Sequence, residues 1–159
     1  MLELRPAPES RAALVRRGWA EDRRVDVSGV LAALRSAGYR IDPVMEEVLS
    51  CLAGIEAGPV NVEGTGFKND EPFVVDPLGV GLRHLREAND LAEWFGAPFC
   101  PLGWWLCRSH VYFTSGGLVV ASLPGVVWHV GDTLSRAIDF MLLADGPLVR
   151  LWSMDGLGG

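Results

Sequence analysis

The chain has 159 residues, of which 49% are hydrophobic and 21% are charged, and its formal net charge is −6. This length fits one domain, and the composition is that of a folded globular protein rather than a disordered chain. The negative charge disfavours nucleic acid as a direct partner, because nucleic-acid binding needs a basic surface.

The first ten residues carry charges and two prolines where a secretory signal needs an apolar stretch. No apolar run reaches the length of about 18 residues that a membrane span needs. The three cysteines, Cys51, Cys100 and Cys107, form no CxxC pair, and their odd number argues against a disulfide framework. We therefore expect a cytoplasmic protein whose cysteines are buried as small apolar side chains.

Helical patterns dominate the first third of the chain. A first helix is predicted over residues 8–18, and a polar connector follows it. A second helix is predicted over residues 28–38, with Asp26 or Ser28 as its cap. The third begins at Asp42-Pro43, where proline gives up no hydrogen-bond donor that a helix needs, and ends at Gly54.

Strand patterns begin after Gly58. Strands are predicted over residues 60–62 and 73–75, joined by a polar loop from Glu63 to Glu71, and a fourth helix is predicted over residues 82–95. Asp132 is expected to cap a fifth helix that ends at Gly146-Pro147. Between these helices four more strands are expected to form a meander, over residues 102–106, 110–113, 118–123 and 126–130.

This order predicts a single α+β domain, with a mainly antiparallel sheet of about six strands flanked by about five helices. The core is expected to lie within residues 9–146, and residues 155–159 are expected to be a frayed tail. Five residues are expected to be buried, namely Trp19, Leu31, Leu49, Phe113 and Ile138.

The chain carries no recognisable catalytic or metal-binding motif. Zinc deaminases need H-x-E followed by P-C-x-x-C, but Arg86 stands two residues after His84, and no cysteine stands three residues after Cys100. Cys107, His110 and His129 complete no tetrahedral zinc pattern either. We therefore expect no metal, no cofactor and no catalytic residue, although a Ser-His-Asp or Cys-His site remains open from sequence alone.

A series of short motifs resembles one family. Gly18-Trp19 is followed by Arg23-Arg24-Val25-Asp26 and then by Gly38-Tyr39 between two helices. In the second half come residues 73–77 with Asp76-Pro77, then Pro101-Leu102-Gly103, Ser115-Gly116-Gly117 and Gly131-Asp132. In this order, over roughly residues 9–146, they resemble the third subfamily of the SUKH (Smi/Knr-like) superfamily, whose members include bacterial toxin-immunity proteins.

The resemblance implies that the protein binds a polymorphic toxin domain, of the nuclease or deaminase type, and neutralises it by occluding its active site. No catalytic residue carries over from the family. Trp19 would be a packing anchor, Asp26 a cap, and Arg23 or Arg24 a partner for a carboxylate. The alternatives are an interaction scaffold unrelated to toxin immunity and a small hydrolase with an unrecognised site.

The uneven charge of the chain indicates where such a partner would bind. Residues 41–100 carry eleven acidic residues against three basic ones, which favours an acidic docking face for a basic protein. The polar loop contributes Glu63, Asp70 and Glu71, and Trp104 or Trp105 is expected to supply an aromatic anchor beside it. The other reading of this loop is that it merely connects two strands.

Overall fold

Three helices form the first third of the protein in the computed structural model, which describes residues 2–153. They are α1 (Pro8–Arg16), α2 (Ser28–Ala37) and α3 (Pro43–Leu52), as the sequence predicts. The side chain of Asp42 accepts a hydrogen bond from the backbone N–H of Met45 and so caps α3. Gly38 ends α2 with a φ of 113°, a left-handed conformation that glycine adopts without steric cost.

The connector between α1 and α2 is fixed to α3. Arg23 donates hydrogen bonds to the carbonyl oxygens of Cys51 and Ala53, both at 2.7 Å, and so satisfies carbonyls at the end of α3. Arg24 lies 3.6 Å from Glu47, and Asp26 accepts from the N–H of Ser28 at the start of α2. The predicted carboxylate partner is therefore found for Arg24, while Arg23 binds backbone carbonyls instead.

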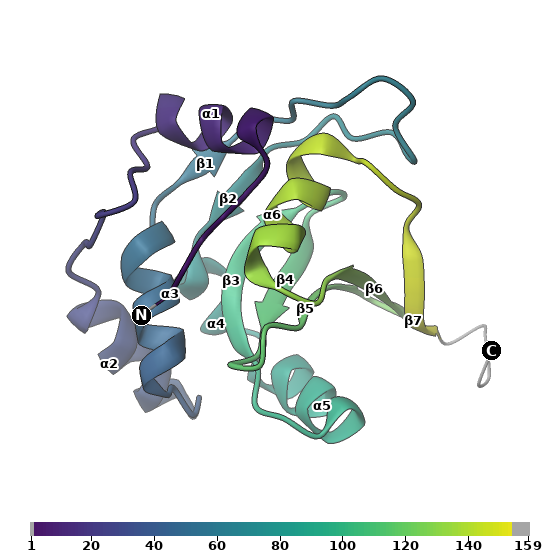
Figure 1. The fold of residues 1–159 in the computed structure, drawn as a ribbon. Coiled ribbons are helices and arrows are strands. Elements are labelled where there is room, and N and C mark those ends of the chain that lie inside the picture. Colours follow the sequence, from purple (N-terminus) through teal and green to yellow (C-terminus); the bar gives the residue numbers. More distant parts are fainter. Residues whose placement is uncertain (1, 154–159) are drawn as a thin grey trace.

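Over residues 2–153 the strands form a seven-stranded antiparallel sheet whose order in space follows the chain, from β1 to β7 (Figure 1). This confirms the predicted α+β class. The strands are β1 (Glu56–Ala57), β2 (Phe73–Val75), β3 (Cys100–Trp105), β4 (Ser109–Phe113), β5 (Val119–Leu123), β6 (Val126–Gly131) and β7 (Val149–Ser153). Three helices interrupt them, α4 (Pro77–Gly81), α5 (Leu85–Phe95) and α6 (Leu134–Leu143).

Helices cover both faces of this sheet. On one face Phe140 of α6 packs against Trp105, and on the other Glu87 of α5 hydrogen-bonds to residues of β4 and β5. Figure 1 shows α1 and α6 close together on the same side of the strands. The residues predicted to be buried are all buried: Trp19, Leu31, Leu49, Phe113 and Ile138.

The predicted strand over residues 60–62 is wrong. The N–H groups of Val60 and Asn61 donate to the carbonyl of Leu142, and that of Val62 donates to the carbonyl of Leu143. These carbonyls belong to the end of α6 and have no partner within the helix. Residues 60–62 therefore bond to them instead of pairing with a neighbouring strand. The first strand is β1 instead, four residues earlier.

Other boundaries also differ from the sequence predictions. The helix predicted over residues 82–95 is α5, and a separate short helix, α4, precedes it, with its last carbonyl accepting from the hydroxyl of Tyr39. Thr133, not Asp132, caps α6. Strand β7 was not predicted, and the predicted tail over residues 155–159 lies outside the described part of the chain.

Within the described residues 2–153, none of the helices is both long and apolar enough to cross a membrane.

Candidate functional site

The acidic loop, defined as residues 58–72, is built onto the end of α6. Besides the three bonds from residues 60–62, the N–H of Gly66 donates to the carbonyl of Ala144 at 2.8 Å. A Cβ on Gly66 would lie only 1.9 Å from the carbonyl oxygen of Gly146, so the two backbones touch here. The loop therefore donates hydrogen bonds to the free carbonyls at the C-terminus of a helix, and these bonds fix it at several points.

Asn69 ties the acidic loop to the core. It is 3% exposed, and its amide nitrogen donates to the carbonyl of Met141 at 2.8 Å while its amide oxygen accepts from the indole N–H of Trp105 at 3.3 Å. Phe67, two residues earlier, packs its ring against Trp105 and Phe140. Two inward-facing residues thus fix the part of the loop between its acidic side chains.

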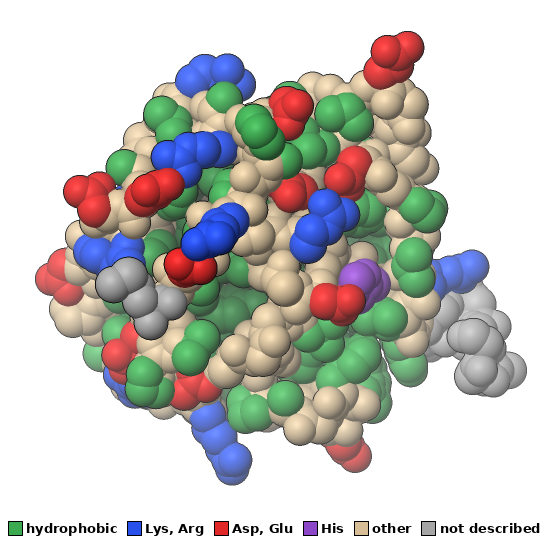
Figure 2. Space-filling model, viewed as in Figure 1, with side chains coloured by type: hydrophobic (Ala, Val, Ile, Leu, Met, Phe, Trp, Pro, Cys, Tyr) green, Lys and Arg blue, Asp and Glu red, His purple; other side chains and the backbone are tan. Residues whose placement is uncertain are grey.

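The three acidic residues expected to meet a partner lie at the surface of this loop. Glu63 and Asp70 are exposed and Glu71 is partly exposed. Asp70 lies 3.4 Å from the ammonium group of Lys68, an ion pair that water screens because both side chains are exposed. At the upper right of Figure 2, where Figure 1 places the loop, an acidic side chain projects from the edge of the molecule.

The two neighbouring tryptophans point to opposite faces of β3, as successive strand residues do. Trp105 is 1% exposed and supports Asn69 from inside, so its side chain cannot contact a partner, and the sequence prediction for this residue is wrong. Trp104 is partly buried on the other face, where it contacts the ring of His110 and the guanidinium of Arg108. Only Trp104 remains available as an aromatic contact.

A polar cluster that the sequence did not reveal joins α5 to the sheet. Glu87 Oε1 accepts from the hydroxyl of Tyr112 at 2.7 Å and lies 2.6 Å from Nδ1 of His110, and Oε2 accepts from Ser122 at 3.1 Å. The ring of His84 lies against that of His110, with centroids 4.0 Å apart. The sequence does show that His110 and Tyr112 alternate and so share one strand face. It does not show their partner, because Glu87 is remote in the sequence.

The protonation states in this cluster follow from burial and hydrogen bonding. Burial alone would raise the pKa of Glu87, but the hydrogen bonds from His110, Tyr112 and Ser122 outweigh it, and the pKa lies below its ordinary value. Burial and the neighbouring carboxylate raise the pKa of Tyr112. The Ser122 hydroxyl donates to the carboxylate rather than to a histidine, so this cluster does not contain the serine–histidine pair of a Ser-His-Asp site.

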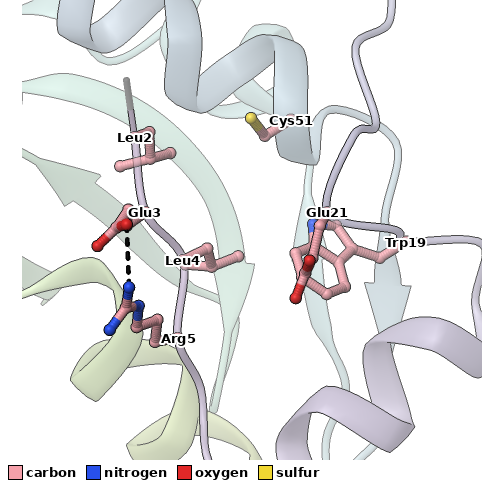
Figure 3. Close-up of a pocket in the computed structure, with 7 residues that line it drawn as sticks. All are labelled: Leu2, Glu3, Leu4, Arg5, Trp19, Glu21 and Cys51. Carbon is pink, nitrogen blue, oxygen red and sulfur yellow. Dashed lines mark hydrogen bonds and ion pairs between the residues drawn. The ribbon is translucent and has the colours of Figure 1, made fainter.

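A pocket of about 250 Å³ lies under the N-terminal segment, residues 2–5 (Figure 3). Leu2 and Leu4 line one side, and Trp19 and Cys51 line the other. Farther along, the N–H of Arg5 donates to Ser135 of α6, and the N–H of Ala7 donates to Asp139, both at 2.8 Å. The segment is therefore attached to a helix that lies more than a hundred residues later in the chain.

The cysteines do not all match the prediction that they are buried. Cys51 and Cys100 are buried, and burial raises the pKa of both thiols, so they are protonated at neutral pH. Cys107 is exposed in the turn between β3 and β4, which corrects the sequence prediction. Across residues 2–153, no three His, Cys, Asp or Glu side chains come together as metal ligands would.

Taken together, these features define an α+β domain with a rigidly held acidic loop on one side and a carboxylate-centred polar cluster on the other. The sequence matches no protein-family model, and no curated protein or solved structure is significantly similar to it.

Proposed function

We propose that the protein is an immunity protein of the SUKH type, which acts in the cytoplasm of the producing cell by binding a basic toxin domain. The acidic loop would cover the toxin's active site. The observation that carries the proposal is that this loop presents Glu63, Asp70 and Glu71 at the surface while Asn69 and Phe67 fix it from inside.

A loop that is already ordered loses little conformational freedom when it binds, and this favours affinity. Toxins that act on nucleic acid need a basic groove, because phosphate neutralisation dominates their binding. Carboxylates held on a rigid loop can take the place of phosphates in such a groove. Opposed charges would also speed the encounter between the two proteins.

The position of the acidic residues is not explained by stability. The loop is bonded to the C-terminus of α6, which carries the negative end of the helix dipole, so negative side chains gain nothing from it. A role in binding accounts for their presence on this loop. The order of motifs that resembles the SUKH family, together with the observed α+β fold, supports the same function.

A SUKH-type role implies that a toxin is encoded beside its immunity protein, so the test is to measure association with a nuclease or deaminase toxin domain from a neighbouring gene. We expect the triple variant Glu63→Lys, Asp70→Lys and Glu71→Lys to fold normally but to associate at least about tenfold more slowly at low salt. The wild-type rate should fall as salt rises, because salt screens the charges.

A matched control has the same net charge as this variant but changes exposed acids elsewhere, through Glu3→Lys, Glu9→Lys and Asp22→Lys. It should slow association much less. Equal rates for the two variants would show that overall charge, not the acidic loop, directs binding. A toxin domain that does not bind the wild-type protein at all would remove the immunity role and favour a scaffold.

A further inference from the structure

A second pocket, here called the tryptophan pocket, lies between α5 and the end of the sheet formed by β5, β6 and β7. Its volume is about 300 Å³, at the lower end of the range for small-ligand sites. Six of its lining residues matter here: Arg86, Glu87, Asp90, Trp94, Ser122 and Trp152. It lies on the face of the sheet that α5 covers.

Two stacked indoles form one wall of this pocket. The rings of Trp94 and Trp152 have centroids 4.6 Å apart and planes at 17° to each other. Trp94 is 46% exposed, which is unusual for so large an apolar side chain on a helix. Because Trp152 holds it in place, its ring offers an ordered π surface, and such a surface attracts a cation within about 6 Å.

Two carboxylates of α5, those of Glu87 and Asp90, also line the pocket. A carboxylate has about four acceptor positions, and Glu87 uses three of them for His110, Tyr112 and Ser122, which leaves one on Oε2. Asp90 lies one helical turn farther on, and it has no ion pair or side-chain hydrogen bond among residues 2–153. With Arg86 as the single cation, the lining keeps one net negative charge.

We infer that the tryptophan pocket binds an arginine side chain of the protein partner. A guanidinium group is flat, so it can stack on an indole while its N–H donors reach a carboxylate, whereas a lysine ammonium offers no plane. The inference rests on the proposed function, since it specifies one residue type that the basic partner would insert. It places a second contact region on the α5 side, separate from the acidic loop.

The direct test uses blocked tripeptides, acetyl-Gly-Arg-Gly-amide and its citrulline counterpart, and needs no toxin. Citrulline has nearly the same shape as arginine but no charge. We expect the arginine peptide to shift the indole N–H signals of Trp94 and Trp152 in NMR spectra, with affinity at least about fivefold higher than that of the citrulline peptide. Equal shifts with both peptides, or none with either, would overturn the inference.

Variants then locate the binding. Asp90→Asn and Trp94→Ala should each weaken arginine-peptide binding about fivefold or more, while Glu93→Gln, an exposed acid on the same helix that does not line the pocket, should leave it unchanged. Circular dichroism of each variant checks that it is folded, and Asp90→Asn carries the test if Trp94→Ala is not. Unchanged binding by a folded Asp90→Asn would count against the inference.

The failures of the two proposals are distinguishable. If the arginine peptide binds but no toxin domain does, arginine binding by the tryptophan pocket is supported and the immunity role is rejected. If the toxin domain binds wild type and Asp90→Asn equally well, the immunity role is supported and the pocket does not contribute to toxin binding.

Discussion

Ser10 is a buried side chain that lowers the stability of the fold around it. It is fully buried in α1, and within the part of the chain that the structure describes its hydroxyl has no hydrogen-bond partner. Burying an unpaired hydroxyl costs free energy, and alanine also favours a helix more than serine does. The residue therefore lowers stability where it stands.

We predict that Ser10→Ala raises the free energy of unfolding by about 1 kcal/mol. Urea denaturation followed by tryptophan fluorescence measures this. Ser36→Ala is the matched control, because Ser36 is an exposed helical serine in α2, and it should show only the smaller propensity effect. A Ser10→Ala variant no more stable than that control would mean that the hydroxyl is satisfied in solution.

At the level of elements, the acidic loop and α6 depend on each other through Asn69. Replacing Asn69 with alanine would leave the N–H of Trp105 and the carbonyl of Met141 without partners in the core. We expect Asn69→Ala to lower the free energy of unfolding by about 2 kcal/mol. Amide exchange at Val60 and Val62 should also become faster, because their bonds to α6 would open more often.

Thr65→Ala serves as the control for this prediction, since Thr65 is exposed in the same loop. Its effect should stay within about 0.5 kcal/mol. If Asn69→Ala leaves both stability and amide exchange at the level of this control, the network around Trp105 does not hold the loop.

Helices and strands whose ends are set by residues adjacent in the sequence could be predicted from the sequence. Asp42-Pro43 and Gly38 marked helix ends by local chemistry, and turn residues around Gly116-Gly117 separated β4 from β5. Residues 60–62 could not be assigned, because the competing partner is the end of α6, about eighty residues later. Strand β7 was missed for the same reason: it forms because β6 offers an edge to pair with.

The candidate site shows the same division. The loop acids could be predicted from their polar surroundings, and the structure does place Glu63 and Asp70 at the surface. Which of Trp104 and Trp105 faces the core depends on the pairing register, which local sequence does not show. The Glu87 cluster and the tryptophan pocket each bring together residues from three or more separate segments, so no spacing rule could have found them.

For the whole molecule, pH should change stability through two groups in different ranges. Burial first, and then the charge of His110, lower the pKa of His84 below 6.5, with Glu87 opposing and Arg83 adding to the shift. The unfolded chain therefore binds a proton on His84 that the folded protein rejects, and stability falls as pH drops below about 6.5. The pKa of Glu87 lies below its ordinary 4.5, so its stabilisation persists down to about pH 4.5 and is lost below it.

We predict that His84→Gln reduces the loss of stability between about pH 7.5 and pH 5.5. Urea denaturation at both values, for the variant and the wild-type protein, measures the difference. NMR titration of the His84 ring in the folded protein provides an independent check. A pH dependence as steep in His84→Gln as in wild type would assign the effect to other groups.

The attachment of residues 2–7 to α6 has a consequence for how the protein is made. Ribosomes release a chain from its N-terminus, and the sheet can form strand by strand as the chain emerges, because each strand pairs with the next one along. The N–H groups of Arg5 and Ala7 find their acceptors only in Ser135 and Asp139. Residues 2–7 therefore leave the ribosome long before α6 does, and until α6 emerges the N–H groups of Arg5 and Ala7 lack these acceptors and the segment is open to other chains in the cell.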